Sequence, residues 1–184
     1  MNELIAWLKT NQGKATAGIG AAGFHLLTAL LQKEIQARIT LVPYRGEAPA
    51  SQDLLAGRID LLFASPVQLP LLRSGMIKAL AVTGDRRLAV APDIATFREV
   101  GLPSLSYSNW FGLFAPKGTL PSIVGQLNRA VVEALADPTV GSRLADLTME
   151  VFPREQQTPD ALGAIVKAGA AKWWPIIKEL GIKA

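Results

Sequence analysis

The chain has 184 residues, of which 49% are apolar and 18% charged, a composition typical of a folded protein with a sizeable core. Its net charge of +4 comes from 19 basic and 15 acidic residues that are scattered along the sequence, so no nucleic-acid partner is expected. The lack of cysteine excludes disulfides, thiolate catalysis and cysteine-based metal sites.

The first half of the sequence alternates short apolar strands with helices. An amphipathic helix is predicted at the start of the sequence, ending near 11–13. Because no basic region comes before its apolar residues, we do not expect this helix to be a secretion signal. This alternation predicts a parallel α/β layer. Strands are predicted at Lys14–Ile19, Ile39–Val42, Ile59–Ala64 and Ile77–Thr83, and helices at Phe24–Ile35, Pro49–Ala56 and Pro66–Arg73.

The second half of the sequence does not continue this alternation of strands and helices. Between Gly84 and Ser108 there is little periodicity, and a strand is predicted at Trp110–Ala115. Apolar stripes then predict helices, the last of which is expected to start at Thr158 and to kink or restart at Pro175. We therefore expect two parts, residues 1–108 and 109–184.

The most distinctive motif is the glycine-rich turn Gly18-Ile19-Gly20-Ala21-Ala22-Gly23, which follows a predicted strand and opens a helix. The first N–H groups of a helix have no partner within it, and the helix dipole favours negative charge there. We expect an anion to bind at this turn. The candidate contacts are the backbone donors of Gly20, Ala21, Ala22, Gly23 and Phe24, with His25 as an auxiliary residue.

The same turn matches the dinucleotide fingerprint G-x-G-x-x-G, so a nucleotide-dependent enzyme is the alternative function. That fingerprint needs an acidic residue at the end of the next strand, where this chain has Val42-Pro43-Tyr44-Arg45. A carboxylate ligand fits the turn better. His25 is equally compatible with a hydrogen bond to a neighbouring loop.

A second strand-to-helix turn includes Ala64 and Ser65, at the strand edge where ligands collect in open α/β sheets. Ser65 is expected to cap the following helix, to contact a ligand, or to do both. Arg45 is expected to be solvated or to pair with an acid nearby such as Glu47, rather than with a ligand. Asp60 is expected to be a structural partner of its strand.

Nothing in the sequence indicates catalysis. The single histidine, the lack of cysteine and the lack of a nucleophile elbow exclude a catalytic triad, and the carboxylates show no paired spacing for acid–base chemistry. We therefore expect a binding protein without a metal or cofactor.

Several blocks of sequence occur in a distinctive order along the chain: Val42-Pro43-Tyr44-Arg45-Gly46, Leu54–Leu61, Ser74–Thr83, Phe97–Pro103 and Trp110–Pro116. Together they resemble the Bug family, the TctC-like extracytoplasmic solute receptors of tripartite tricarboxylate transporters, along nearly the whole chain.

This resemblance implies a type II periplasmic-binding-protein fold, in which two α/β lobes close on a small organic carboxylate held by backbone N–H groups and waters. It implies a periplasmic location and membrane transporter subunits as partners. Residues 1–108 would form the second lobe with a leading helix, and 109–184 the crossover strand and C-terminal helices of the first lobe. Trp110 would lie where the chain crosses between lobes.

The resemblance also implies that most of the N-terminal lobe is missing from this chain. The C-terminal helices would then expose apolar side chains, including Trp173, Trp174, Val131 and Leu135. We expect homodimer formation or exchange of elements through these helices, or weak ligand binding by the chain alone. An effector-sensing domain with a similar two-lobe fold ranks last, because no DNA-binding helix pair precedes it.

Overall fold

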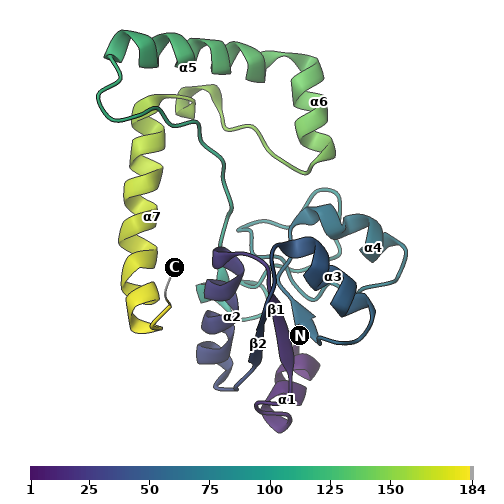
Figure 1. Cartoon of the computed structure of the whole chain (residues 1–184). Helices are drawn as coiled ribbons and strands as arrows, with labels where there is room; N and C mark the ends of the chain where they lie inside the picture. The colour runs from purple at the N-terminus through teal and green to yellow at the C-terminus, as the bar shows by residue number, and fades with distance from the viewer. Residues whose placement is uncertain (183–184) are drawn as a thin grey trace. The chain divides into compact units, whose positions relative to one another are not determined.

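The computed structural model describes residues 1–182 and divides the chain into two compact units (Figure 1). The first unit is Met1–Ser108, and the second begins at Asn109. Each unit is described by itself.

A three-stranded parallel sheet forms the centre of the first unit, in the order β2-β1-β3. Its strands are β1 (Thr16–Ile19), β2 (Thr40–Pro43) and β3 (Leu61–Leu62). Thr16 pairs with Thr40, and Ala17 pairs with Leu41 on one side and Leu61 on the other. The helical elements are α1 (Asn2–Thr10), α2 (Ala22–Ile35), α3 (Glu47–Leu55), η1 (Pro66–Gln68), α4 (Leu69–Arg73) and η2 (Pro103–Leu105). The predicted α/β layer is confirmed.

The core of this unit lies between α2 and the sheet. Because apolar residues recur every three or four positions along α2, they share the face that packs on β1. Leu27 is 1% exposed, Ala17 of β1 is 3% exposed, and Leu8 of α1 is fully buried. Each buried leucine contributes about 1.5–3 kcal/mol through removal of its surface from water.

Two predicted strands are wrong. Ile77–Thr83 forms only an isolated bridge, between Val82 and Thr96, and Trp110–Ala115 has no strand pairing. Both segments have suitable apolar residues, but a strand also needs a neighbour that accepts its backbone hydrogen bonds. The periodicity of the sequence shows that the apolar residues are present, but it does not show whether a neighbouring strand is available.

The second unit contains α5 (Pro121–Ala136), α6 (Pro138–Asp146), η3 (Arg154–Gln156) and α7 (Pro159–Glu179). Thr158 caps α7 as predicted, because its Oγ1 accepts the N–H of Ala161 at 3.1 Å. Pro175 lies inside α7, which continues to Glu179 instead of restarting.

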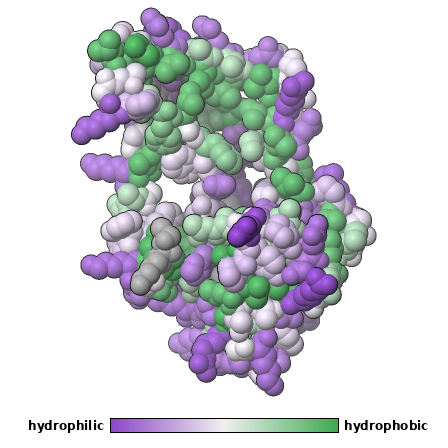
Figure 2. Space-filling model, in the orientation of Figure 1, coloured by the Kyte–Doolittle hydropathy of each residue, from purple (hydrophilic) through white to green (hydrophobic). Residues whose placement is uncertain are grey.

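None of the described residues of the second unit is buried. Trp174 is 70% exposed and Phe111 74% exposed, and Figure 2 shows apolar residues gathered over this unit. The predicted exposure of apolar surface on these helices is therefore present at Trp174, whereas Trp173, Val131 and Leu135 are half-buried. Within residues 1–182, no helix has the length and apolar character needed to cross a membrane.

Candidate ligand-binding site

The turn between β1 and α2 has free backbone donors. Ala21 is the N-cap of α2 with an extended backbone (φ −156°, ψ 156°), and its carbonyl accepts the N–H groups of Phe24 and His25, both at 3.1 Å. In the described part of the chain, no acceptor is recorded for the N–H groups of the four preceding residues, Gly20, Ala21, Ala22 and Gly23. The free donors therefore stop before Phe24.

These donors can be reached from outside the fold. Ala21 and Ala22 are exposed, and Gly20 and Gly23 are half-buried. An anion placed here would meet unpaired N–H groups and the positive end of the helix dipole. The turn therefore has the electrostatic character that the sequence predicts.

Gly20 and Gly23 also have a packing role that the sequence pattern does not reveal. A Cβ atom on Gly20 would lie 2.7 Å from the carbonyl carbon and oxygen of Gly46, so the turns that follow β1 and β2 are in backbone contact. A Cβ atom on Gly23 would lie 2.8 Å from the hydroxyl oxygen of Tyr107. The glycines let Gly46 and Tyr107 approach the donors closely.

The turn after β3 already holds a carboxylate of the chain itself. Oε1 of Glu47 accepts the N–H of Ser65 and the side-chain N–H of Gln68, each at 3.0 Å. The backbone donor of Ser65 is therefore engaged, and its side chain makes no capping hydrogen bond. Ala64 beside it is exposed.

Arg45 is solvated, which is the first of the two alternatives expected for it, and the alternative pairing with Glu47 does not form. The Glu47 carboxylate reaches across to Ser65, and Arg45 is exposed, with no ion pair recorded for it within residues 1–182. A local charge pattern favours neighbours in sequence, whereas this bond joins residues 18 positions apart. Arg45 leaves a positive charge near the end of β2.

Tyr44 fixes the turn that contains Arg45. Its hydroxyl donates to Oδ2 of Asp53 in α3 at 2.8 Å, and Arg58 donates to the other oxygen at 3.0 Å. The hydrogen bond from Tyr44 lowers the pKa of the Asp53 carboxyl, and the same bond raises the pKa of Tyr44. Tyr44 therefore ties β2 to α3 instead of facing a ligand.

Asp60 has the structural role that was expected. Its Oδ2 accepts both the backbone N–H and the hydroxyl of Thr16, each at 2.8 Å. This contact joins the start of β3 to the start of β1, far from the turns at the other end of the strands.

His25 and Trp110 complete the set of predicted contacts. His25 is half-buried in the first turn of α2, and the described residues show no side-chain hydrogen bond from it to a neighbouring loop. Trp110 is half-buried and belongs to the second unit. The structure thus brings together the turns after β1, β2 and β3. That Trp110 contacts a ligand stays a prediction, because Trp110 belongs to the second unit.

Comparison with solved structures identifies the fold of the chain. The periplasmic binding protein BugD matches with a TM-score of 0.84 and 30% identity, over all of this chain and 62% of that one. The chain has the fold of a periplasmic binding protein. It belongs to the tripartite tricarboxylate transporter receptor family, TctC, which it matches over residues 1–182.

Other matches carry ligands. The Rhodopseudomonas palustris protein MatC with bound malate shares 30% identity and a TM-score of 0.83, over 96% of this chain and 61% of that one. R. palustris Rpa4515 with adipate shares 29% identity and a TM-score of 0.84, over 98% and 60%. These proteins and the family are binding receptors rather than enzymes, so the nucleotide-dependent enzyme has no support.

Curated relatives give the same assignment. Protein BugT of Bordetella pertussis is 34% identical over all of this chain and 56% of its own length. The chain therefore spans about half the length of this relative, and about 60% of the solved structures above.

Proposed function

We propose that this chain is the carboxylate-binding part of a solute receptor that serves a tripartite tricarboxylate-type transporter in the periplasm. The observation that carries the proposal is the row of unpaired N–H groups from Gly20 to Gly23 at the start of α2. The malate and adipate bound by two related structures support a small organic carboxylate as the ligand.

The proposed contacts follow from the hydrogen bonds within the turn. One ligand carboxylate accepts the N–H groups of Gly20, Ala21, Ala22 and Gly23, while His25 lies one helical turn away. Because Ser65 already donates to Glu47, a ligand reaches the turn after β3 through the exposed Ala64, through the Ser65 hydroxyl, or through water. Trp110 remains a proposed contact from the second unit.

A single substitution can remove one donor and leave the fold intact. Ala22 is the first residue of α2, a position that favours proline, and the extended backbone of Ala21 suits the residue before a proline. Ala22→Pro therefore deletes one unpaired N–H without breaking a helical hydrogen bond. Ala22→Ser keeps the N–H and is the matched control.

The test is a titration of the full chain with malate and adipate, followed by backbone amide shifts in NMR, which also detects weak binding. We expect shifts centred on Gly20–Gly23 in the unaltered chain and in Ala22→Ser. A hydrogen bond to a charged group contributes about 1.5–3 kcal/mol, so Ala22→Pro should weaken binding roughly 10- to 150-fold. Equal affinity of the two variants would remove this turn from the site, and no shifts with either acid would reject the function.

A further inference from the structure

The hydroxyl group of Tyr107 lies beside the row of unpaired amides at the start of α2. A Cβ atom on Gly23 would lie 2.8 Å from the phenol oxygen of Tyr107 and 3.3 Å from the ring carbon that carries it. Because glycine has only hydrogen in that position, the hydroxyl approaches the helix backbone without a clash. The turn of backbone donors therefore has a side-chain hydroxyl next to its last member.

Two contacts within the first unit hold Tyr107 in this place. The short helix η2 ends two residues before Tyr107 and packs on α2, and Leu105 of η2 is fully buried. The backbone N–H of Tyr107 itself donates to the carbonyl oxygen of Thr83 at 2.8 Å. The position of the hydroxyl is therefore determined by the packing of residues 1–108.

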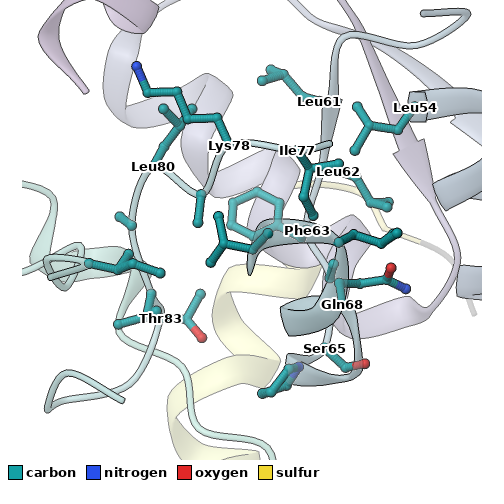
Figure 3. A pocket seen from close by; sticks show the side chains of 18 of the residues that line it. Leu54, Leu61, Leu62, Phe63, Ser65, Gln68, Ile77, Lys78, Leu80 and Thr83 are labelled. Carbon is teal, nitrogen blue, oxygen red and sulfur yellow. The ribbon is translucent and has the colours of Figure 1, made fainter. Parts of the chain in front are cut away.

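The segment that anchors Tyr107 lies at the same end of the sheet as the three turns. Thr83 and Ser65 both line a cavity of about 590 Å³, and Figure 3 shows both on the side of this cavity away from Leu61. Leu61 begins β3 and Ser65 follows its end, so this side of the cavity is the strand-end side. Tyr107 thus belongs to the edge where the ligand is proposed to bind.

The Gly23 amide and the Tyr107 hydroxyl are close enough to hold one ligand oxygen between them. A Cβ atom lies about 2.5 Å from the backbone nitrogen of its residue, so the phenol oxygen is at most roughly 5.3 Å from the Gly23 nitrogen. An oxygen at hydrogen-bond distance from both groups spans up to about 5.6 Å. No acceptor within residues 1–182 is recorded for the Gly23 N–H.

The chemistry of a phenol suits this position. Its hydroxyl is both a donor and an acceptor, so a hydrogen bond that it makes within the protein is compatible with another to a ligand. A hydrogen bond donated to a carboxylate is short and strong, because the acceptor carries a charge. Tyr107 is half-buried, so a ligand has access to it while the ring stays packed.

On the basis of the carboxylate site proposed above, we propose that Tyr107 is a ligand-contacting residue whose hydroxyl donates to the same carboxylate as the amides of Gly20–Gly23. One carboxylate oxygen lies between the Gly23 N–H and the phenol, and the other accepts from the amides before Gly23. The hydroxyl contacts the carboxylate and no other part of the ligand. Acids that differ only beyond this carboxylate therefore depend on Tyr107 to the same degree.

The test uses the full chain with fluorotyrosine in place of tyrosine, titrated with malate and adipate. The chain has two tyrosines, and Tyr44 is the internal control because its hydroxyl donates to Asp53 at 2.8 Å. Fluorine NMR follows both rings, and Tyr107→Phe assigns the two signals. We expect the Tyr107 signal to move with the same saturation curve as the amide shifts of Gly20–Gly23, and the Tyr44 signal to stay in place.

Tyr107→Phe also measures the contribution of the hydroxyl, since the ring is kept. We expect this variant to bind malate and adipate about tenfold or more weakly, by the same factor for both acids. Urea unfolding of the variant checks the fold, and the fluorine signal reports the contact without any substitution at 107.

Three results would overturn the proposal. Amide shifts at Gly20–Gly23 without movement of the Tyr107 signal, and with unchanged affinity in Tyr107→Phe, would reject Tyr107 and leave the proposed function standing. A loss of affinity confined to malate would mean that the phenol contacts its 2-hydroxyl group instead of the carboxylate. No shifts at either place would reject both this contact and the proposed function.

Discussion

The close contact between Gly20 and the backbone of Gly46 can be tested by substitution. In Gly20→Ala the new methyl group would lie 2.7 Å from two backbone atoms of Gly46 and 2.9 Å from the Glu47 nitrogen. Backbone cannot rotate away as a side chain can, so the turns after β1 and β2 must separate. Overpacking of this kind costs about 1–3 kcal/mol.

Gly23→Ala provides the comparison within the same turn. Its methyl group meets the hydroxyl end of Tyr107 at 2.8 Å, and with Tyr107→Phe the nearest remaining atom lies at 3.3 Å. We expect Gly23→Ala to cost less than Gly20→Ala, and Tyr107→Phe to recover part of that loss in the double variant. Alanine also restricts the unfolded chain more than glycine does, which adds up to about 1 kcal/mol in its favour.

The assay is urea unfolding of both single variants, of Tyr107→Phe and of the Gly23→Ala/Tyr107→Phe double variant. The double-mutant cycle isolates the clash from any other contact that Tyr107 makes. A Gly20→Ala variant as stable as the unaltered chain would refute the backbone contact between the two turns. Additive effects at 23 and 107 would refute the contact between Gly23 and Tyr107.

Three other predictions concern the rest of the chain. Thr158→Ala should destabilise α7 by about 1 kcal/mol, seen as lost helical signal in circular dichroism, because the cap of the Ala161 N–H is removed. The hydrogen bond from Arg87 lowers the pKa of Glu99 from 4.5 to about 2. The Glu99 carboxylate therefore stabilises the fold fully above about pH 4.5, and this stabilisation is lost as the pH falls from about 4.5 towards 2. Glu99→Gln should flatten that part of the curve of urea midpoint against pH, and an unaltered curve would contradict the assignment. Light scattering should give a dimer that Trp174→Lys weakens, because this side chain is 70% exposed; a monomer at all concentrations would contradict self-association.

The parallel layer and the glycine turn could be predicted because both depend on local patterns. Repeated apolar spacing gives α2, and small residues ahead of it leave the amides of Ala22 and Gly23 open. The bond from Glu47 to Ser65 could not be predicted, because it joins residues brought together only by the order of the strands. The one available signal was an acidic residue in the first turn of a helix beside a strand end.

The wrong prediction of a strand at Ile77–Thr83 also has a non-local reason. Its apolar residues were correctly recognised, but the strand that should pair with it is not determined by its own sequence. The packing reason for Gly20 and Gly23 is also non-local, since it depends on Gly46 and Tyr107. In each case the sequence predicts the local conformation of a segment but not which distant residues pack against it.

The lack of buried residues in the described part of the second unit has a calorimetric consequence. The heat-capacity increment of melting follows the apolar area newly hydrated. In the monomer, helices whose side chains are exposed or half-buried contribute little to it, so the increment for the monomeric chain should resemble that of the first unit alone. Heating should then give one sharp endotherm from residues 1–108, accompanied by a broad, shallow loss of helix from the remainder.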